Sequence, residues 1–125
     1  MVIGVGLDIV EIERIERLLA RYGEHFVGKL MGEPEAALLP TAAAERTLAV
    51  ALAVAGKEAA SKAIGTGWSQ GVFWRDVVVV RAPVPAVRLE REAAAVAKRL
   101  GSSGRTRARL ELRGSLAVGE VWLLR

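Results

Sequence analysis

The sequence has 125 residues, of which 52% are hydrophobic and 26% are charged, and it contains no cysteine. Length and apolar content predict a single folded domain, residues 1–125, and exclude global disorder, while the lack of cysteine excludes disulfides, thiolate catalysis and cysteine-based zinc sites. The net charge of +4 favours anionic partners, which include nucleic acid, anionic cofactors and acidic proteins, and composition does not choose among them.

The distribution of apolar residues indicates neither a membrane-spanning helix nor a secretion signal. The first residues, Met1 to Asp8, carry no basic leader and no long apolar run. The longest apolar run, about Leu48 to Gly56, is far shorter than the roughly 20 residues that a membrane helix needs. We therefore expect a cytoplasmic protein with no membrane partner.

The first half of the chain predicts one strand followed by helices. Residues Val2–Ile9 are rich in Val and Ile and indicate a buried strand, and Val10–Tyr22 has the apolar stripe of a helix. A short helix is expected to begin at Glu33-Pro34-Glu35. The main helix is expected to start after Thr41 as its N-cap and to run to about Ile64.

The second half predicts more strands than helices. The expected elements are a strand at Val72–Val80, a break at 82–85, a helix at Leu89–Leu100, and strands at 106–112 and Leu116–Leu124 joined by a short hairpin loop. Together with the first half, this order predicts an α+β fold in which a mostly antiparallel sheet packs on one long helix.

The end of the main helix carries the polar groups of greatest interest. Glu58, Ser61, Lys62 and Gly65 are spaced i, i+3, i+4 and i+7, so they share one helix face. A carboxylate, a hydroxyl and an ammonium group before a glycine-rich exit suit a metal ion and a phosphate. Simpler interpretations stay open, since Glu58 and Lys62 also fit a surface ion pair and 65–67 also fits a helix stop.

Asp8 is the second carboxylate of interest. It fits either a helix N-cap or a metal ligand at the end of the first strand. If the fold brings Asp8 to Glu58, the two form a divalent-metal site. Lys57, directly before Glu58, fits an ordinary exposed residue. The only histidine, His25, is far from these motifs in sequence and is given no role.

Other motifs are less specific. Arg14, Arg17 and Arg21 lie on one helix face, which is either solvated or a docking surface for an acidic partner. Glu13 precedes Arg17 by four residues, the favourable order for an ion pair. The glycines at 65–67 lack the spacing of a P-loop, and those at 4–6 lack that of a dinucleotide site.

Two long motifs together resemble those of holo-acyl-carrier-protein synthases, the small bacterial 4′-phosphopantetheinyl transferases. The motifs are Gly6-Leu7-Asp8-Ile9-Val10-Glu11-Ile12-Glu13-Arg14-Ile15 and Lys57-Glu58-Ala59-Ala60-Ser61-Lys62-Ala63-Ile64-Gly65-Thr66-Gly67, and the segment 71–77 resembles the strand that follows them. Their order, their spacing and the chain length also fit, so the resemblance covers nearly the whole chain.

The resemblance implies an activity and its partners. The enzyme would transfer the phosphopantetheine arm of coenzyme A to a serine of apo acyl carrier protein and release adenosine 3′,5′-bisphosphate. Asp8 and Glu58 would hold Mg²⁺, Lys62 would contact the phosphates, and Glu58, directly or through a bound water, would take the serine proton. The family is commonly a trimer with each site between two subunits.

The resemblance also assigns two binding surfaces. Ser61, Lys62, Gly65 and Thr66 would line the nucleotide of coenzyme A. The first helix, with Arg14 and Arg21, would face the acidic carrier protein.

Three positions depart from the family pattern. Ala53 and Val54 stand where the family usually has an arginine and an aromatic residue, and the next-to-last strand has no histidine at 109–113. We hypothesise that Arg109 or Arg113 replaces part of the missing positive charge. The departures also motivate an alternative, a homologue that binds coenzyme A or carrier protein with weakened turnover. A non-enzymatic basic module that binds nucleic acid is a second alternative.

Overall fold

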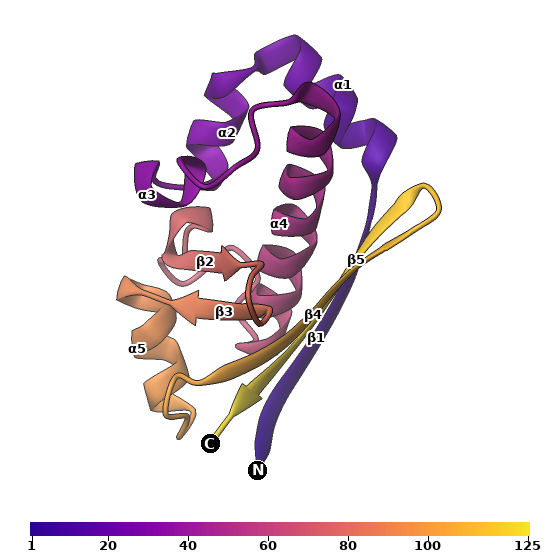
Figure 1. The fold of residues 1–125 in the computed structure, drawn as a ribbon. Coiled ribbons are helices and arrows are strands. Elements are labelled where there is room, and N and C mark those ends of the chain that lie inside the picture. The colour runs from indigo at the N-terminus through magenta and orange to yellow at the C-terminus, as the bar shows by residue number, and fades with distance from the viewer.

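The computed structural model describes all 125 residues and confirms the α+β architecture. Strands β1 (Val2–Glu11), β5 (Leu116–Leu124) and β4 (Thr106–Arg113) form an antiparallel sheet in the order β1-β5-β4. Helix α4 (Ala43–Ala63) packs along one face of this sheet (Figure 1). No helix combines the length and the apolar content needed to cross a membrane.

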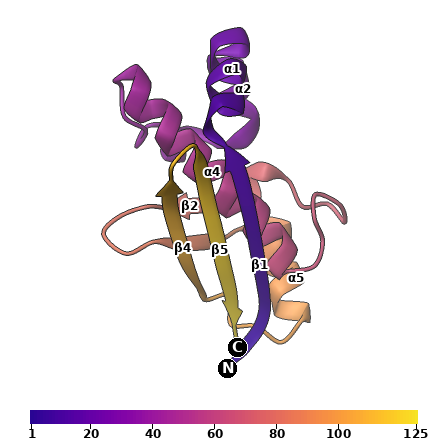
Figure 2. The ribbon, with the colours of Figure 1, turned by 90° about the vertical axis from the view of Figure 1, so that its right-hand side faces the viewer.

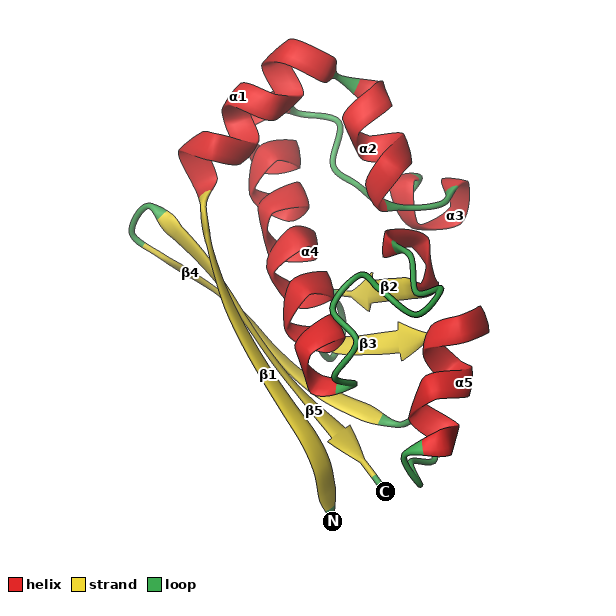
Figure 3. Ribbon diagram, turned by 180° about the vertical axis from the view of Figure 1, so that it is seen from behind, coloured by secondary structure: helices red, strands yellow, loops and turns green.

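The remaining elements surround α4. Helices α1 (Ile12–Tyr22) and α2 (Glu24–Leu30) lie toward the end of α4 where that helix begins, and α3 (Glu33–Ala36) lies farther along it. A two-stranded sheet of β2 (Val77–Val80) and β3 (Ala86–Leu89) lies on the side of α4 away from the larger sheet, followed by α5 (Arg91–Arg99) (Figure 3). The long helix is therefore enclosed between two sheets, and most of its residues are buried.

The opposite face of the larger sheet is left uncovered. Figure 2 shows strands β4, β5 and β1 in front of α4, with no other element of the chain over them. Side chains of β1 alternate between the two faces. Val5, Leu7 and Ile9 point outward and are 54%, 50% and 56% exposed, whereas Gly6 and Val10 are buried against the helix.

Several element boundaries differ from the sequence prediction. The first strand continues to Glu11, because Val10 and Glu11 pair with Ala117 and Leu116 of β5, so the helix begins at Ile12 and not at Val10. Asp8 therefore lies within the strand, and its interpretation as a helix N-cap is wrong. Thr41 is not the N-cap of the main helix either, since Ala42 occupies that position without a side-chain hydrogen bond.

The segment after α4 shows the largest difference. Only Val77–Val80 is a strand in the predicted range, because Trp74–Asp76 forms a 3₁₀ turn in which the Asp76 carboxylate accepts a hydrogen bond from the Phe73 N–H at 2.9 Å. Strand β3 was not predicted, and α5 begins at Arg91 and not at Leu89. The four residues of β3 follow the proline-rich turn and pair antiparallel with the neighbouring β2, so the two strands form a hairpin. The sequence pattern did not indicate β3 because prolines stand directly before it and weaken the signal of a strand.

Candidate active site

Strand β1 carries Asp8 on the face of the sheet that packs on α4. The two surfaces meet at glycines: a Cβ on Gly6 would lie 1.8 Å from the Ala59 carbonyl oxygen, and one on Gly4 would lie 2.1 Å from that of Ala63. Residues two apart in a strand share a face, so Asp8 has the same orientation as Gly4 and Gly6. Close strand–helix packing therefore places Asp8 beside the C-terminal half of α4.

Lys62 of α4 reaches across this contact to Asp8. Its Nζ donates to Asp8 Oδ1 and to the Leu7 carbonyl oxygen, both at 3.0 Å. The interpretation of Lys62 as the ion-pair partner of Glu58 is therefore wrong, because the carboxylate that it contacts comes from β1. About half of the Lys62 side chain, 51%, remains exposed, so its ammonium group is accessible to a ligand.

Asp8 and Glu58 line the same cavity, which has a volume of about 350 Å³. Its charged part is made by Asp8, Glu11, Arg14 and Glu58. The rest of its lining is apolar and comprises Ile9, Val10, Ile15, Leu18, Phe26, Leu30, Val54 and Trp74. The fold thus brings together the two carboxylates that the sequence placed 50 positions apart, and it adds an arginine from α1.

The two carboxylates suit Mg²⁺. This ion is usually held in proteins by one or two carboxylates, and it completes its coordination with waters and substrate phosphate oxygens. The fold contains no group of three or more histidine, cysteine or carboxylate side chains that could enclose a metal. The donor set at Asp8 and Glu58 therefore fits a cation that binds together with a phosphate-bearing substrate.

The other residues expected at the nucleotide lie at the end of α4. Ser61 is buried, and its hydroxyl donates to the Glu58 carbonyl oxygen at 2.7 Å. Thr66 is also buried, and its hydroxyl donates to the Gly67 carbonyl oxygen at 2.8 Å. Gly65 is exposed and has φ = 81°, which confirms the helix stop. Both hydroxyl groups thus donate their hydrogen bonds to backbone carbonyls of this chain, and the backbone at Gly65 is exposed to solvent.

Arg109 and Arg113 are not brought to this cavity. Both lie on β4, which β5 separates from β1. Arg109 pairs in register with Glu120, and both are on the outward face of the sheet, opposite the face that carries Asp8. Arg113 is exposed, with its Nε 3.6 Å from Glu111 Oε1. Within one chain, neither arginine joins Asp8 and Glu58.

Helix α1 presents its arginines to solvent, as the spacing predicts. Arg14 is exposed and also lines the cavity of Asp8 and Glu58. Arg17 forms the predicted ion pair with Glu13 at 2.9 Å. The Arg21 guanidinium lies over the Tyr22 ring, 5.3 Å from its centroid. The helix therefore connects an exposed basic surface to the candidate site.

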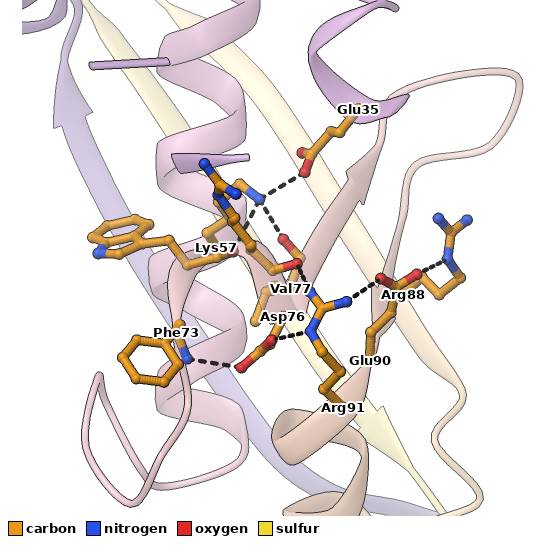
Figure 4. A network of polar contacts seen from close by, with 10 residues as sticks. Glu35, Lys57, Phe73, Asp76, Val77, Arg88, Glu90 and Arg91 are labelled. Atoms are coloured by element: carbon orange, nitrogen blue, oxygen red, sulfur yellow. Dashed lines mark hydrogen bonds and ion pairs between the residues drawn. The ribbon is translucent and has the colours of Figure 1, made fainter. Parts of the chain in front are cut away.

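Lys57 is buried, so its interpretation as an ordinary exposed residue is wrong. Its side chain has 0% exposure, and its ammonium group donates to Glu35 Oε1 at 2.9 Å, to the Trp74 carbonyl oxygen at 3.2 Å and to the Val77 carbonyl oxygen (Figure 4). Burial lowers the pKa of Lys57 from its ordinary value, and the attraction of Glu35 opposes this change. Composition and spacing carried no signal for this pair, because its two residues come from different helices.

The Lys57–Glu35 pair joins three elements around the site. Glu35 Oε2 accepts a further hydrogen bond from the Val79 N–H at 3.1 Å, so the pair links α3 and α4 to β2. Removing one member of a buried pair leaves an uncompensated charge, which typically costs about 3–5 kcal/mol. Because Lys57 directly precedes Glu58, this anchoring also holds the part of α4 that presents the candidate site.

Comparison with known proteins assigns the chain to a family. Residues 4–116 match the sequence model of the 4′-phosphopantetheinyl transferase superfamily. The chain belongs to this superfamily. A holo-[acyl-carrier-protein] synthase of Methylobacterium sp. (strain 4-46) is 47% identical over 97 residues, which are 76% of this chain and 71% of that relative. A synthase of the same name from Sinorhizobium fredii is 45% identical over 97 residues, 76% of this chain and 69% of the relative.

Solved structures of phosphopantetheinyl transferases agree with the fold. A holo-(acyl-carrier-protein) synthase from Bacillus anthracis, in complex with CoA (3′,5′-ADP), superposes with a TM-score of 0.74 and 29% identity, over 98% of this chain and 96% of that chain. The synthase from Neisseria meningitidis has a TM-score of 0.81 and 24% identity over the whole of both chains, and this similarity concerns the fold alone. The family resemblance is confirmed, and the chain is a transferase.

Proposed function

We propose that this phosphopantetheinyl transferase moves the 4′-phosphopantetheine arm of coenzyme A to a serine of apo acyl carrier protein, with Mg²⁺ as cofactor. The observation that supports this best is the cavity that Asp8 and Glu58 share with Arg14. In the reaction, the serine oxygen forms a bond to the phosphorus that carries the arm. The bond from that phosphorus to the bridging oxygen breaks, and adenosine 3′,5′-bisphosphate leaves.

Each polar residue of the site has a role in this proposal. Asp8 and Glu58 hold Mg²⁺, which would neutralise the charge that develops on the leaving phosphate. Glu58 also accepts the serine proton, directly or through a water. Lys62, whose ammonium group is exposed and oriented by Asp8 and the Leu7 carbonyl, contacts the diphosphate. Gly65 and the backbone around Ser61 and Thr66 border the nucleotide.

The metal and the product are tested by following adenosine 3′,5′-bisphosphate. With coenzyme A, apo carrier protein and Mg²⁺, chromatography is expected to show this nucleotide accumulating in step with carrier modification. Excess EDTA should stop its release, and added Mg²⁺ should restore it. A carrier whose acceptor serine is replaced by alanine is the control. Release that continues in EDTA, or with that carrier, contradicts the proposal.

The acidic carrier protein is proposed to dock on α1. Arg14 and Arg21 are exposed on this helix, and Arg14 also lines the site cavity, so a carrier bound there would have its serine close to Glu58. Opposite charges across an interface chiefly accelerate association. We therefore assign the basic charge of the chain to this partner rather than to nucleic acid.

We propose that the protein is a homotrimer that associates through the uncovered face of the larger sheet. Val5, Leu7 and Ile9 expose a continuous apolar row there, and exposed rows of this kind mark interaction surfaces. Arg109 lies on the same face, so it or Arg113 would reach coenzyme A from a neighbouring subunit, in keeping with a site between two subunits.

The trimer is tested by light scattering on a sizing column. The wild type is expected at about three times the chain mass of 13.4 kDa. Leu7→Lys, which places a charge in the middle of the apolar row, should shift the protein to smaller species, whereas Ala37→Lys, at the exposed residue that follows α3, should leave the mass unchanged. A wild type that elutes as a monomer at micromolar concentration contradicts the proposal.

A further inference from the structure

One indole of a stacked tryptophan pair lines the site cavity. Trp74 lines the cavity that contains Asp8 and Glu58, and its ring stacks on that of Trp68. The ring centroids are 4.1 Å apart and the planes are inclined by 22°. Stacking of two aromatic rings gives a stabilisation in addition to that from their buried area, and it favours one relative orientation of the rings. An ordered aromatic surface therefore lies next to the charged groups of the candidate site.

The backbone that carries Trp74 is fixed from both sides. The Trp74 carbonyl oxygen accepts the hydrogen bond from buried Lys57 at 3.2 Å. The preceding residue, Phe73, is bound to Asp76 twice: its N–H donates to the Asp76 carboxylate, and its carbonyl oxygen accepts from the Asp76 N–H, both at 2.9 Å. Figure 4 shows Lys57, Phe73 and Asp76 around this turn. Hydrogen bonds therefore hold the backbone at Trp74 in place. One of them comes from Lys57, which directly precedes Glu58 in the sequence.

Trp68 contacts Trp74 by ring stacking, and its indole N–H makes no hydrogen bond. The Trp68 indole N–H is buried and has no hydrogen-bond acceptor. Leaving a buried donor unpaired is destabilising, so hydrogen bonding does not account for the position of this side chain. Its ring instead packs on Trp74 and against the hydrophobic core. Trp68 thus supports the indole of Trp74, which lines the cavity.

The cavity and coenzyme A each combine charged and apolar groups. The cavity is lined by charged residues, which include Asp8, Glu58 and Arg14, and by apolar residues, which include Trp74 and the short side chain of Val54. Coenzyme A has a charged diphosphate, and the arm attached to it begins with a methylene group followed by a dimethyl-substituted carbon. A ligand placed with its diphosphate at the carboxylates would bring that apolar carbon to the apolar residues.

From this match we propose that Trp74, supported by Trp68, is a positioning residue that packs against the phosphopantetheine arm of coenzyme A. The inference rests on the proposed function and adds a specificity element to the same site. The adenosine part of coenzyme A does not touch Trp74 in this arrangement. Binding of the arm and binding of the nucleotide should therefore respond differently to a change at this residue.

Calorimetry with two ligands tests the proposal. Trp74→Ala is expected to weaken the binding of coenzyme A about tenfold or more, which is the loss for one buried apolar contact, and to leave the binding of adenosine 3′,5′-bisphosphate unchanged. In steady-state kinetics, KM for coenzyme A should rise more than kcat falls, and Trp74→Phe should restore most of the affinity. Phe73→Ala is the matched control, because Phe73 is the adjacent aromatic residue, is 69% exposed and does not line this cavity.

The outcomes separate this inference from the proposed function. Equal weakening of both ligands by Trp74→Ala, or unchanged coenzyme A binding, overturns the role of Trp74 while transfer by the wild type still supports the function. A wild type that neither binds coenzyme A nor transfers its arm overturns both. Urea unfolding of each variant reports whether it is folded, and Trp74→Leu replaces the alanine variant if that one is not.

Discussion

Replacing Glu58 with glutamine should lower the rate of phosphopantetheine transfer by about a thousandfold or more. The amide has the shape of the carboxylate but lacks the charge that holds Mg²⁺ and the basicity that accepts the serine proton. The rate is measured from the mass of the carrier protein over time. Glu45→Gln, at the exposed start of the same helix, is the matched control and should keep wild-type activity.

Asp8→Asn distinguishes a shared metal site from two independent effects. If Asp8 and Glu58 bind the same ion, Asp8→Asn alone should also cause a large loss, and the double variant should lose little more than Glu58→Gln does. Mg²⁺ titrations should show weakened metal dependence in both single variants. Losses that multiply in the double variant, or a Glu58→Gln enzyme that works normally, would show that the two residues do not act together.

Gly6→Ala should destabilise the fold by about 3 kcal/mol or more. The added Cβ would lie 1.8 Å from the Ala59 carbonyl oxygen, and backbone atoms of a central helix cannot move aside as a flexible side chain can. The loss is measured as the shift of the urea unfolding midpoint. Because Asp8 follows two residues later on the same face, the folded fraction should also lose activity.

A matched glycine-to-alanine change provides the control. In Gly28→Ala, within α2, the nearest group to a new Cβ is the end of the Arg75 side chain at 4.0 Å, which is ordinary contact. This variant should be as stable as the wild type or up to about 1 kcal/mol more stable, since alanine favours the helix. If Gly6→Ala unfolds at the same urea concentration as Gly28→Ala, the close packing of β1 on α4 does not limit stability.

The α+β architecture could be predicted from the sequence because most helices and strands are indicated by patterns of neighbouring residues. The β-branched start, the long alanine-rich helix and the alternating final strands each indicate their element from neighbouring residues alone. Boundaries went wrong where partners distant in sequence decide them. Val10 and Glu11 remain in β1 because β5, at the other end of the chain, pairs with them. Strand β3 was missed for another reason, since it forms a hairpin with the neighbouring β2 and prolines interrupt the pattern directly before it.

The site was predictable only in part for the same reason. The motif around Glu58 indicated a charged helix face, and strand alternation together with close packing explains how Asp8 reaches it. The pairing of Lys62 with Asp8 and the burial of Lys57 with Glu35 depend on contacts between elements. The i, i+4 spacing therefore suggested the wrong partner for Lys62, and residue type alone suggested exposure for Lys57. No role was predicted for Trp74 from the sequence, because its place beside the cavity depends on how the segment after α4 folds back.

The central claim is that Asp8 and Glu58 form a working transferase site although Ala53, Val54 and the strand without histidine depart from the family pattern. Intact-mass spectrometry of several apo acyl carrier proteins, each incubated with coenzyme A, Mg²⁺ and this protein, tests it most directly. We predict that at least one carrier gains the mass of one phosphopantetheine group on its acceptor serine. Tight binding of coenzyme A by calorimetry with no mass gain on any carrier would contradict the claim and identify a homologue that binds without turnover.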